Sequence, residues 1–140
     1  MITRTALALV ALAAFSLPCR GADANALLGA WHGSSLCTDL KVAPGCHDEQ
    51  VVYDVSIVAG AVDKVHISAD KLVAGKRELM GQFDLVQDGA DGGAWVYDFS
   101  TRAGLMRWRF LVHGARLDGE LLAMPARTRI RQVQATPGAR

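Results

Sequence analysis

The sequence predicts an all-β protein: a small, antiparallel up-and-down β-barrel of about eight strands, pinned by one disulfide. Nearly everything after Asn25 alternates between apolar and polar residues, with the period of two that a half-buried strand requires. Short segments rich in glycine separate the alternating runs, at intervals of roughly 10 to 15 residues. A two-sheet β-sandwich would produce a similar pattern and is the alternative fold.

The expected strands follow one another along the chain with short turns between them. They cover residues 29–37, 51–58, 64–70, 78–86, 94–100, 105–113, 116–123 and 127–133. The expected turns lie at residues 59–60, 74–75, 88–93, 103–104 and 113–114. Glycine and aspartate at these places supply the positive-φ positions that hairpin turns need.

One face of the central strands carries no charge. Its expected inward positions are, in chain order, Val51, Tyr53, Val55, Ile57, Val65, Ile67, Ala69, Leu79, Gly81, Phe83, Leu85, Trp95, Tyr97, Phe99, Met106, Trp108, Phe110, Val112, Leu117, Gly119, Leu121 and Ala123. Because a buried unpaired charge is very costly, such a face suits either a solid core or an apolar pocket. An eight-stranded barrel has an interior just large enough for packed side chains or one small ligand.

The first residues have the parts of a secretory signal peptide. Arg4 precedes an uncharged apolar stretch, residues 6–17, that is shorter than the ~20 residues of a membrane-spanning helix. Residues 22–24 offer small side chains where a signal peptidase reads, so we expect residues 1–24 to be removed. Lipid attachment at Cys19 fits poorly, because proline precedes it. We therefore expect an exported protein, periplasmic or secreted.

Cleavage would leave one domain, residues 25–140, with a frayed tail from Ala135. It would also leave two cysteines, Cys37 and Cys46, separated by a short polar loop. In an oxidising compartment this pair is most simply a disulfide. The competing interpretation, a metal thiolate pair, lacks the tight spacing of metal sites.

Charge gives no sign of nucleic-acid binding. The full chain has 15 Lys and Arg and 14 Asp and Glu, and removal of Arg4, Arg20 and Asp23 leaves 13 of each sign. A near-neutral protein has no overall field to attract nucleic acid or an anionic membrane. We expect a monomer with no nucleic-acid partner and no stable membrane anchor.

Gly29-Ala30-Trp31 resembles the glycine–any–tryptophan signature on the first strand of lipocalins and their calycin relatives. In that group the tryptophan plugs the closed end of the barrel, and an arginine from the last strand packs across its ring. The resemblance implies a structural role for Trp31 and a cation–π contact with Arg127, Arg129 or Arg131, of which Arg129 is taken as the partner.

A longer similarity covers residues from about 28 to 125. The segments 31–37, 44–49 and 51–53 and the stretch ADKLVAGKRELMG look like small exported bacterial proteins of uncharacterised function. This similarity supports the disulfide and the single domain, and it implies no activity. The barrel is shorter than in typical lipocalins, and the other short motifs of that family are not evident.

Residues 46–49, Cys-His-Asp-Glu, are the densest polar cluster. With His32 they could hold a metal, but consecutive residues of an extended chain point in different directions. We expect Asp48 and Glu49 to bind backbone amides or an arginine instead. Ser34 and Ser35 lack the sharp turn of a catalytic nucleophile. The sequence therefore predicts no catalytic residue, no metal site and no cofactor.

A dense aromatic set is the candidate ligand-binding site, and it consists of Tyr53, Trp95, Tyr97, Trp108 and Phe110. These rings could wall a pocket for a planar or lipophilic ligand, or they could simply fill a small barrel. Small inward residues keep a pocket possible, because they leave room: Ala69, Gly81, Gly119 and Ala123.

Arginines gather in the last strands: Arg102, Arg107, Arg109, Arg116, Arg127, Arg129 and Arg131. They could form a basic outer face that docks an acidic partner or lipid headgroups. The alternative is cross-strand pairing with Asp98, Asp118 and Glu120, at outward positions of adjacent strands.

The leading functional hypothesis is a non-enzymatic binding protein that holds a small lipophilic ligand in the barrel interior. The alternative is a protein-interaction module, such as an inhibitor or envelope accessory, that acts through the basic outer face or through the loop 38–48. The first hypothesis predicts an open apolar interior, and the second predicts a solid core.

Overall fold

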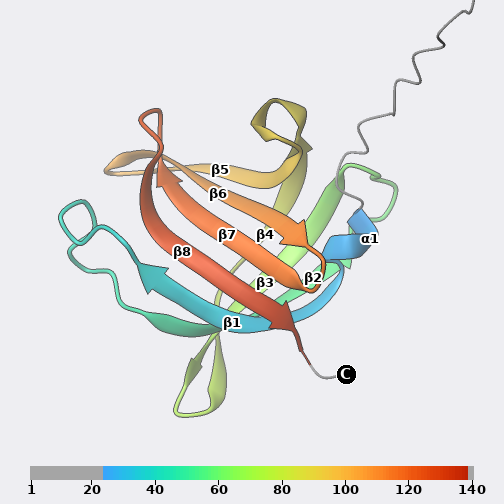
Figure 1. Ribbon diagram of the computed structural model, residues 1–140, viewed down its shortest axis with the longest axis horizontal. Helices are drawn as coiled ribbons and strands as arrows, with labels where there is room; N and C mark the ends of the chain where they lie inside the picture. The colour runs from blue at the N-terminus through green and yellow to red at the C-terminus, as the bar shows by residue number, and fades with distance from the viewer. Residues whose placement is uncertain (1–23, 139–140) are drawn as a thin grey trace, which may run out of the picture.

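The computed structural model describes residues 24–138. Its elements are a helical turn α1 (Ala24–Leu27), β1 (Gly29–Cys37), β2 (Glu49–Ile57), β3 (Lys64–Val73), β4 (Lys76–Asp88), a 3₁₀ turn η1 (Gly89–Asp91), β5 (Ala94–Thr101), β6 (Gly104–His113), β7 (Arg116–Ala123) and β8 (Thr128–Pro137). Each strand pairs antiparallel with the next, and β8 pairs with β1 to close the barrel (Figure 1). The predicted eight-stranded up-and-down barrel is confirmed, and the sandwich alternative is wrong.

The half of the barrel next to α1 is a packed core. Leu27 and Trp31 are buried there, and the Trp31 indole Nε1 donates a hydrogen bond to the Leu27 carbonyl at 2.8 Å. The other core side chains at this end come from the inward positions of β2, β3, β4, β5, β7 and β8: Val55, Val65, Leu85, Trp95, Leu117, Val133 and Ala135. Trp31 thus fills the closed end, together with the helical turn that precedes it.

The opposite end of the barrel carries the loop 38–48 and the disulfide. Cys37 and Cys46 are bonded, with Cα atoms 6.1 Å apart, as the sequence predicts. The Cys37 amide donates to the Asp48 carboxylate at 2.8 Å, which ties the two ends of the loop together. The tight turn between β3 and β4 is at this end too, where Ala74 and Gly75 both take the positive φ of a two-residue hairpin turn.

Two bulges change which side chains face the interior. Ala69 pairs with Gly81 but Asp70 pairs with Leu79, so Met80 is an extra residue in β4. Leu79, expected inside, is 62% exposed, and Met80, expected outside, is 42% exposed and contributes to the lining of the interior cavity. A bulge in β8 similarly leaves Ile130 as an extra, buried residue.

The wall of the barrel is weakest between β4 and β5. These strands pair only from Val86–Val96 to Asp88–Ala94, whereas β4 pairs with β3 along almost its whole length. The β3–β4 hairpin therefore splays away from β5 and β6 (Figure 1).

Two expectations about the C-terminal strand are wrong. Residues 135–137, expected as a frayed tail, belong to β8, and Pro137 pairs with Trp31. The same register places Arg131 opposite Cys37, six residues from Trp31 along β1 and about 20 Å away. Arg127 and Arg129 lie farther still, so none of the three can pack on the Trp31 ring.

The predicted signal peptide, residues 1–24, lies outside the described residues except for Ala24, as does Cys19. Within residues 24–138, no helix is both long enough and apolar enough to cross a membrane. The Cys37–Cys46 disulfide is compatible with an oxidising, extracytoplasmic compartment.

Candidate functional site

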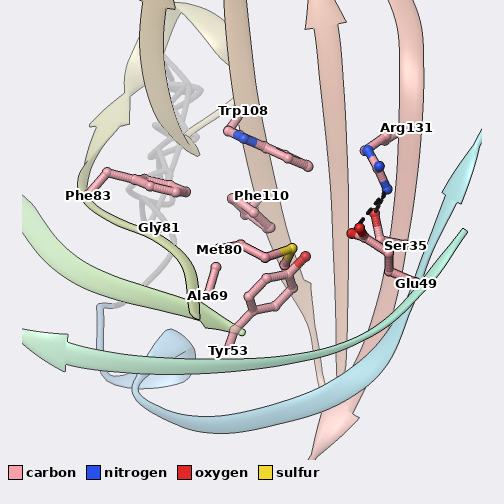
Figure 2. Close-up of a pocket in the computed structure, with 10 residues that line it drawn as sticks. All are labelled: Ser35, Glu49, Tyr53, Ala69, Met80, Gly81, Phe83, Trp108, Phe110 and Arg131. Carbon is pink, nitrogen blue, oxygen red and sulfur yellow. Dashed lines mark hydrogen bonds and ion pairs between the residues drawn. The ribbon is translucent and has the colours of Figure 1, made fainter. Parts of the chain in front are cut away.

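A cavity of about 220 Å³ lies inside the barrel, between the packed core and the end that carries the disulfide loop. Its lining residues are Ser35 of β1, Glu49 and Tyr53 of β2, Ala69 of β3, Met80, Gly81 and Phe83 of β4, Trp108 and Phe110 of β6, and Arg131 of β8. Figure 2 shows them arranged around one space, with aromatic rings on one side and the polar groups on the other.

The apolar wall is built from stacked rings. Trp108 and Phe110, two residues apart on β6, point to the same side of the sheet and stack at a centroid distance of 5.7 Å. Tyr53 meets the edge of Phe110 at 5.8 Å. Phe83 and the thioether of Met80 extend this wall along β4. Such a surface suits an apolar or planar group.

Of the two inward glycines, Gly81 leaves empty space in the cavity and Gly119 does not. A methyl group built at Gly81 would meet nothing within 4 Å, so this position opens into the cavity. A methyl group at Gly119 would lie 2.7 Å from the Phe110 ring, which already occupies that space. Both glycines were expected to leave room, and only Gly81 does.

The polar wall consists of Glu49 of β2, Ser35 of β1 and Arg131 of β8, three strands that lie side by side in that order. Arg131 donates from Nη1 to the Ser35 hydroxyl at 3.1 Å and lies 3.5 Å from the Glu49 carboxylate (Figure 2). These side chains are largely buried: Ser35 is 2% exposed, and the Arg131 side chain is 16% exposed. A buried arginine beside an apolar cavity is costly unless its charge is matched.

Tyr53 links the two walls. Its ring packs on Phe110, and its hydroxyl points toward the polar wall in Figure 2. Burial is the main influence on this group, and it holds the pKa of Tyr53 well above its usual value, although the nearby Arg131 acts in the opposite direction. The phenol therefore stays protonated and is available as a hydrogen-bond donor.

Of the five aromatic residues predicted as the ligand site, three line the cavity and two do not. Tyr53, Trp108 and Phe110 line the cavity. Trp95 is 1% exposed in the packed core, and its indole Nε1 has no hydrogen-bond partner among the described residues. Tyr97 stacks on Phe83 at 4.6 Å, behind the cavity wall.

The residues that the sequence reasoning missed are the polar ones. Ser35 is four residues from Trp31 in β1, and an even spacing puts both side chains on the same face of the strand. Glu49 is likewise two residues from Val51, and Arg131 is two residues from Val133. The alternation of each strand, followed to the open end of the barrel, would have placed all three inside. Met80 carried no such signal, because the bulge that turns it inward interrupts the alternation.

Two residues of the polar cluster at 46–49 make the contacts that the sequence predicts, with a backbone amide and with an arginine. Asp48 accepts from the Cys37 amide, and Glu49 pairs with Arg131. His32 and His47 are exposed. Among residues 24–138, no group of three His, Cys, Asp or Glu side chains is placed to hold a metal ion.

Five of the arginines predicted for the outer face are paired with carboxylates, whereas Arg102 makes no ion pair among residues 24–138. Asp91 accepts hydrogen bonds from Arg107, Arg109 and Arg127. The further ion pairs are Arg107 with Asp88 and Asp98, Arg109 and Arg129 with Glu120, and Arg116 with Asp118. The pairing interpretation therefore holds for these five arginines, and Arg131, expected on this face, lines the cavity inside the barrel instead.

Comparison with known proteins supports the fold. No family model matches the chain, and no curated protein matches it. A solved structure described as a redesigned β-barrel is similar, with a TM-score of 0.52 and 11% sequence identity, over 89% of this chain and all of that one. At this identity the similarity shows the barrel fold alone.

Proposed function

We propose that this protein is a non-enzymatic binding protein that holds a small lipophilic molecule inside its barrel. The observation that carries the proposal is the cavity beside Trp108 and Phe110, which the chain leaves open at Gly81 although the other half of the barrel is packed solid. Its volume of about 220 Å³ is below the roughly 300–1,000 Å³ of pockets for drug-sized ligands. The ligand is accordingly small. The proposal includes export, with the protein acting as a monomer in the periplasm or outside the cell.

The rival function, a protein-interaction module that acts through a basic face, has less support. Five arginines of that face are paired with Asp88, Asp91, Asp98, Asp118 and Glu120, and Arg102 alone makes no ion pair among residues 24–138, so little of the positive charge of this surface is unmatched. An internal cavity is useful to a protein that binds a small ligand. It gives no advantage to an inhibitor that acts through its surface.

The protein's own tryptophans provide a test of ligand binding. The chain has three, of which Trp108 lines the cavity, whereas Trp31 and Trp95 lie in the packed core. Titration with 1-octanol, a small neutral amphiphile, should shift the Trp108 indole N–H resonance in a heteronuclear NMR spectrum and saturate. The Trp31 resonance should move little.

A cavity-filling variant locates the binding. Gly81→Leu should abolish the shift, because the new side chain occupies the space. Gly89→Leu is the matched control: its position is also open, it lies in η1 and it does not line the cavity, so binding should persist. The proposal fails if 1-octanol leaves all three indole resonances unmoved. It also fails if Gly81→Leu and Gly89→Leu bind 1-octanol equally.

A further inference from the structure

The cavity has two unlike walls, and this limits what can fill it. The rings of β6 and the side chains of β4 offer mainly apolar contact, whereas Ser35, Glu49 and Arg131 offer hydrogen bonds on the opposite side (Figure 2). A purely apolar ligand would exclude water from these polar groups and leave their remaining hydrogen-bonding positions unsatisfied, which costs free energy. A ligand that fits both walls is amphipathic, with one polar end and one apolar end.

Arg131 has hydrogen-bonding capacity to spare. Its contacts with Ser35 and Glu49 both come from Nη1. The Nε–H and Nη2–H groups, which share the other edge of the guanidinium, make no hydrogen bond to residues 24–138 in the structure. This edge has the fork geometry that binds a carboxylate through two parallel hydrogen bonds.

The ion pair with Glu49 is loose. The distance of 3.5 Å exceeds the roughly 2.7–2.9 Å of a charge-assisted hydrogen bond, so the arginine is not committed to this partner. The two neighbouring hydroxyls, of Ser35 and Tyr53, can both donate. Together with the unused edge of Arg131, these hydroxyls supply several hydrogen-bond donors to one end of the cavity, which suits an anionic group.

We infer that the ligand is a small carboxylic acid, whose carboxylate binds the free edge of Arg131 and whose apolar tail lies against Trp108, Phe110 and Gly81. This inference rests on the proposed function and names the ligand class of the same cavity. Glu49 opposes the ligand's charge. It keeps the site close to neutral when empty and weakens binding when the carboxylate is present.

The test compares octanoate with 1-octanol, which have tails of similar length and different headgroups. With the Trp108 indole resonance as readout at pH 7, octanoate should bind about tenfold tighter or more, since hydrogen bonds between ions exceed those to a neutral hydroxyl. Arg131→Gln should remove this preference, so that octanoate binds no tighter than 1-octanol. Arg129→Gln is the matched control: it lies two residues away on the outer surface, paired with Glu120, and should preserve the preference.

Glu49→Gln provides an independent test, because it should raise octanoate affinity where Arg131→Gln lowers it. Removal of the competing carboxylate should raise octanoate affinity several-fold relative to 1-octanol affinity. This variant decides the matter if Arg131→Gln fails to fold.

The outcomes separate the two proposals. Equal affinity for the two probes, or a preference that survives Arg131→Gln, overturns the carboxylate inference while the lipophile proposal stands. A fall in octanoate affinity in Glu49→Gln also overturns the inference. If neither probe binds, both proposals fail.

Discussion

The ring of Phe83 stacks on that of Tyr97, with centroids 4.6 Å apart and planes 17° from parallel, beside the last backbone pair that joins β4 to β5. Beyond Val86 and Val96, these strands share no residue pairs in the described chain, and side chains hold the wall together. Phe99 continues the stack from Tyr97 at 5.5 Å. This part of the barrel is closed by aromatic contact in place of a hydrogen-bonded ladder.

The contact between Phe83 and Tyr97 should be measurable by a double-mutant cycle. We expect Phe83→Ala and Tyr97→Ala to couple by about 0.5–1.5 kcal/mol in the free energy of unfolding, the usual range for an aromatic pair. Urea denaturation of the two single variants and the double variant measures the coupling. A cycle of Phe83→Ala with Val62→Ala, an exposed residue elsewhere, should be additive. Additivity in both cycles would show that the stack adds nothing beyond burial.

Gly119 and Gly81 should respond oppositely to the same substitution. Gly119→Ala places a methyl group 2.7 Å from Phe110 and 3.0 Å from Val133, and we expect a loss of about 1–3 kcal/mol from overpacking. Gly81→Ala meets nothing within 4 Å and reduces the freedom of the unfolded chain, so stability should hold or rise slightly. Thermal and urea unfolding measure both. Equal losses would mean that the cavity at Gly81 is not open.

Asp91 should link stability to pH. Burial opposes its ionisation, but hydrogen bonds from Arg109 and Arg107 outweigh burial and hold the pKa of Asp91 below its usual value. A carboxyl with a lowered folded-state pKa stabilises the protein above its unfolded pKa, about 3.9, and this contribution is lost as the pH falls through the folded value. Asp91→Asn should therefore cost about 1.5–3 kcal/mol at pH 7.

The difference between Asp91→Asn and the parent protein should shrink as the pH falls below about 4, when measured by urea unfolding at a series of pH values. Asp63→Asn, an exposed carboxylate outside the arginine network, should change stability by less than about 0.5 kcal/mol at pH 7. A cost for Asp91→Asn that stays constant down to pH 2 would contradict the electrostatic explanation.

The disulfide should contribute to stability mainly by restricting the unfolded chain. Cys37 and Cys46 are nine positions apart, and closure of so short a loop is worth about 2.5–3 kcal/mol in the chain-entropy model. The double variant Cys37→Ala/Cys46→Ala should lose this amount relative to the oxidised protein. A reductant should destabilise the parent protein equally and leave the variant unaffected. An effect of the reductant on the variant would point to another cause.

The closed barrel was predictable because alternation and turn residues are local signals. Val51, Tyr53 and Val55 face inward as their spacing requires, and Ala74-Gly75 forms the expected hairpin turn. Alternation fails at Leu79 and Met80, because a bulge exchanges inside and outside from one residue to the next. Such a bulge depends on the pairing of two strands, which the sequence of one strand does not reveal.

The cavity was only partly predictable. The aromatic residues on its wall follow from parity, but which small residue leaves a hole depends on the neighbouring rings: Phe110 fills the space at Gly119 and nothing fills it at Gly81. Arg131 appeared to belong to an outer basic face, because charge was expected to point to solvent. Its partners Ser35 and Glu49 lie on other strands and far away in the sequence.

The seam between β1 and β8 also determines when the molecule can finish folding. It joins the first strand of the barrel to the last, from Trp31–Pro137 to Cys37–Arg131, so its contacts have the largest sequence separations in the barrel. Contacts between residues so far apart in the sequence form slowly, because a long loop must close before any of them is made. During synthesis β1 has no partner on this side until β8 exists, and β7 likewise presents an open edge. A nearly complete chain is therefore the form most prone to edge-to-edge aggregation, and closure of this one seam ends that risk.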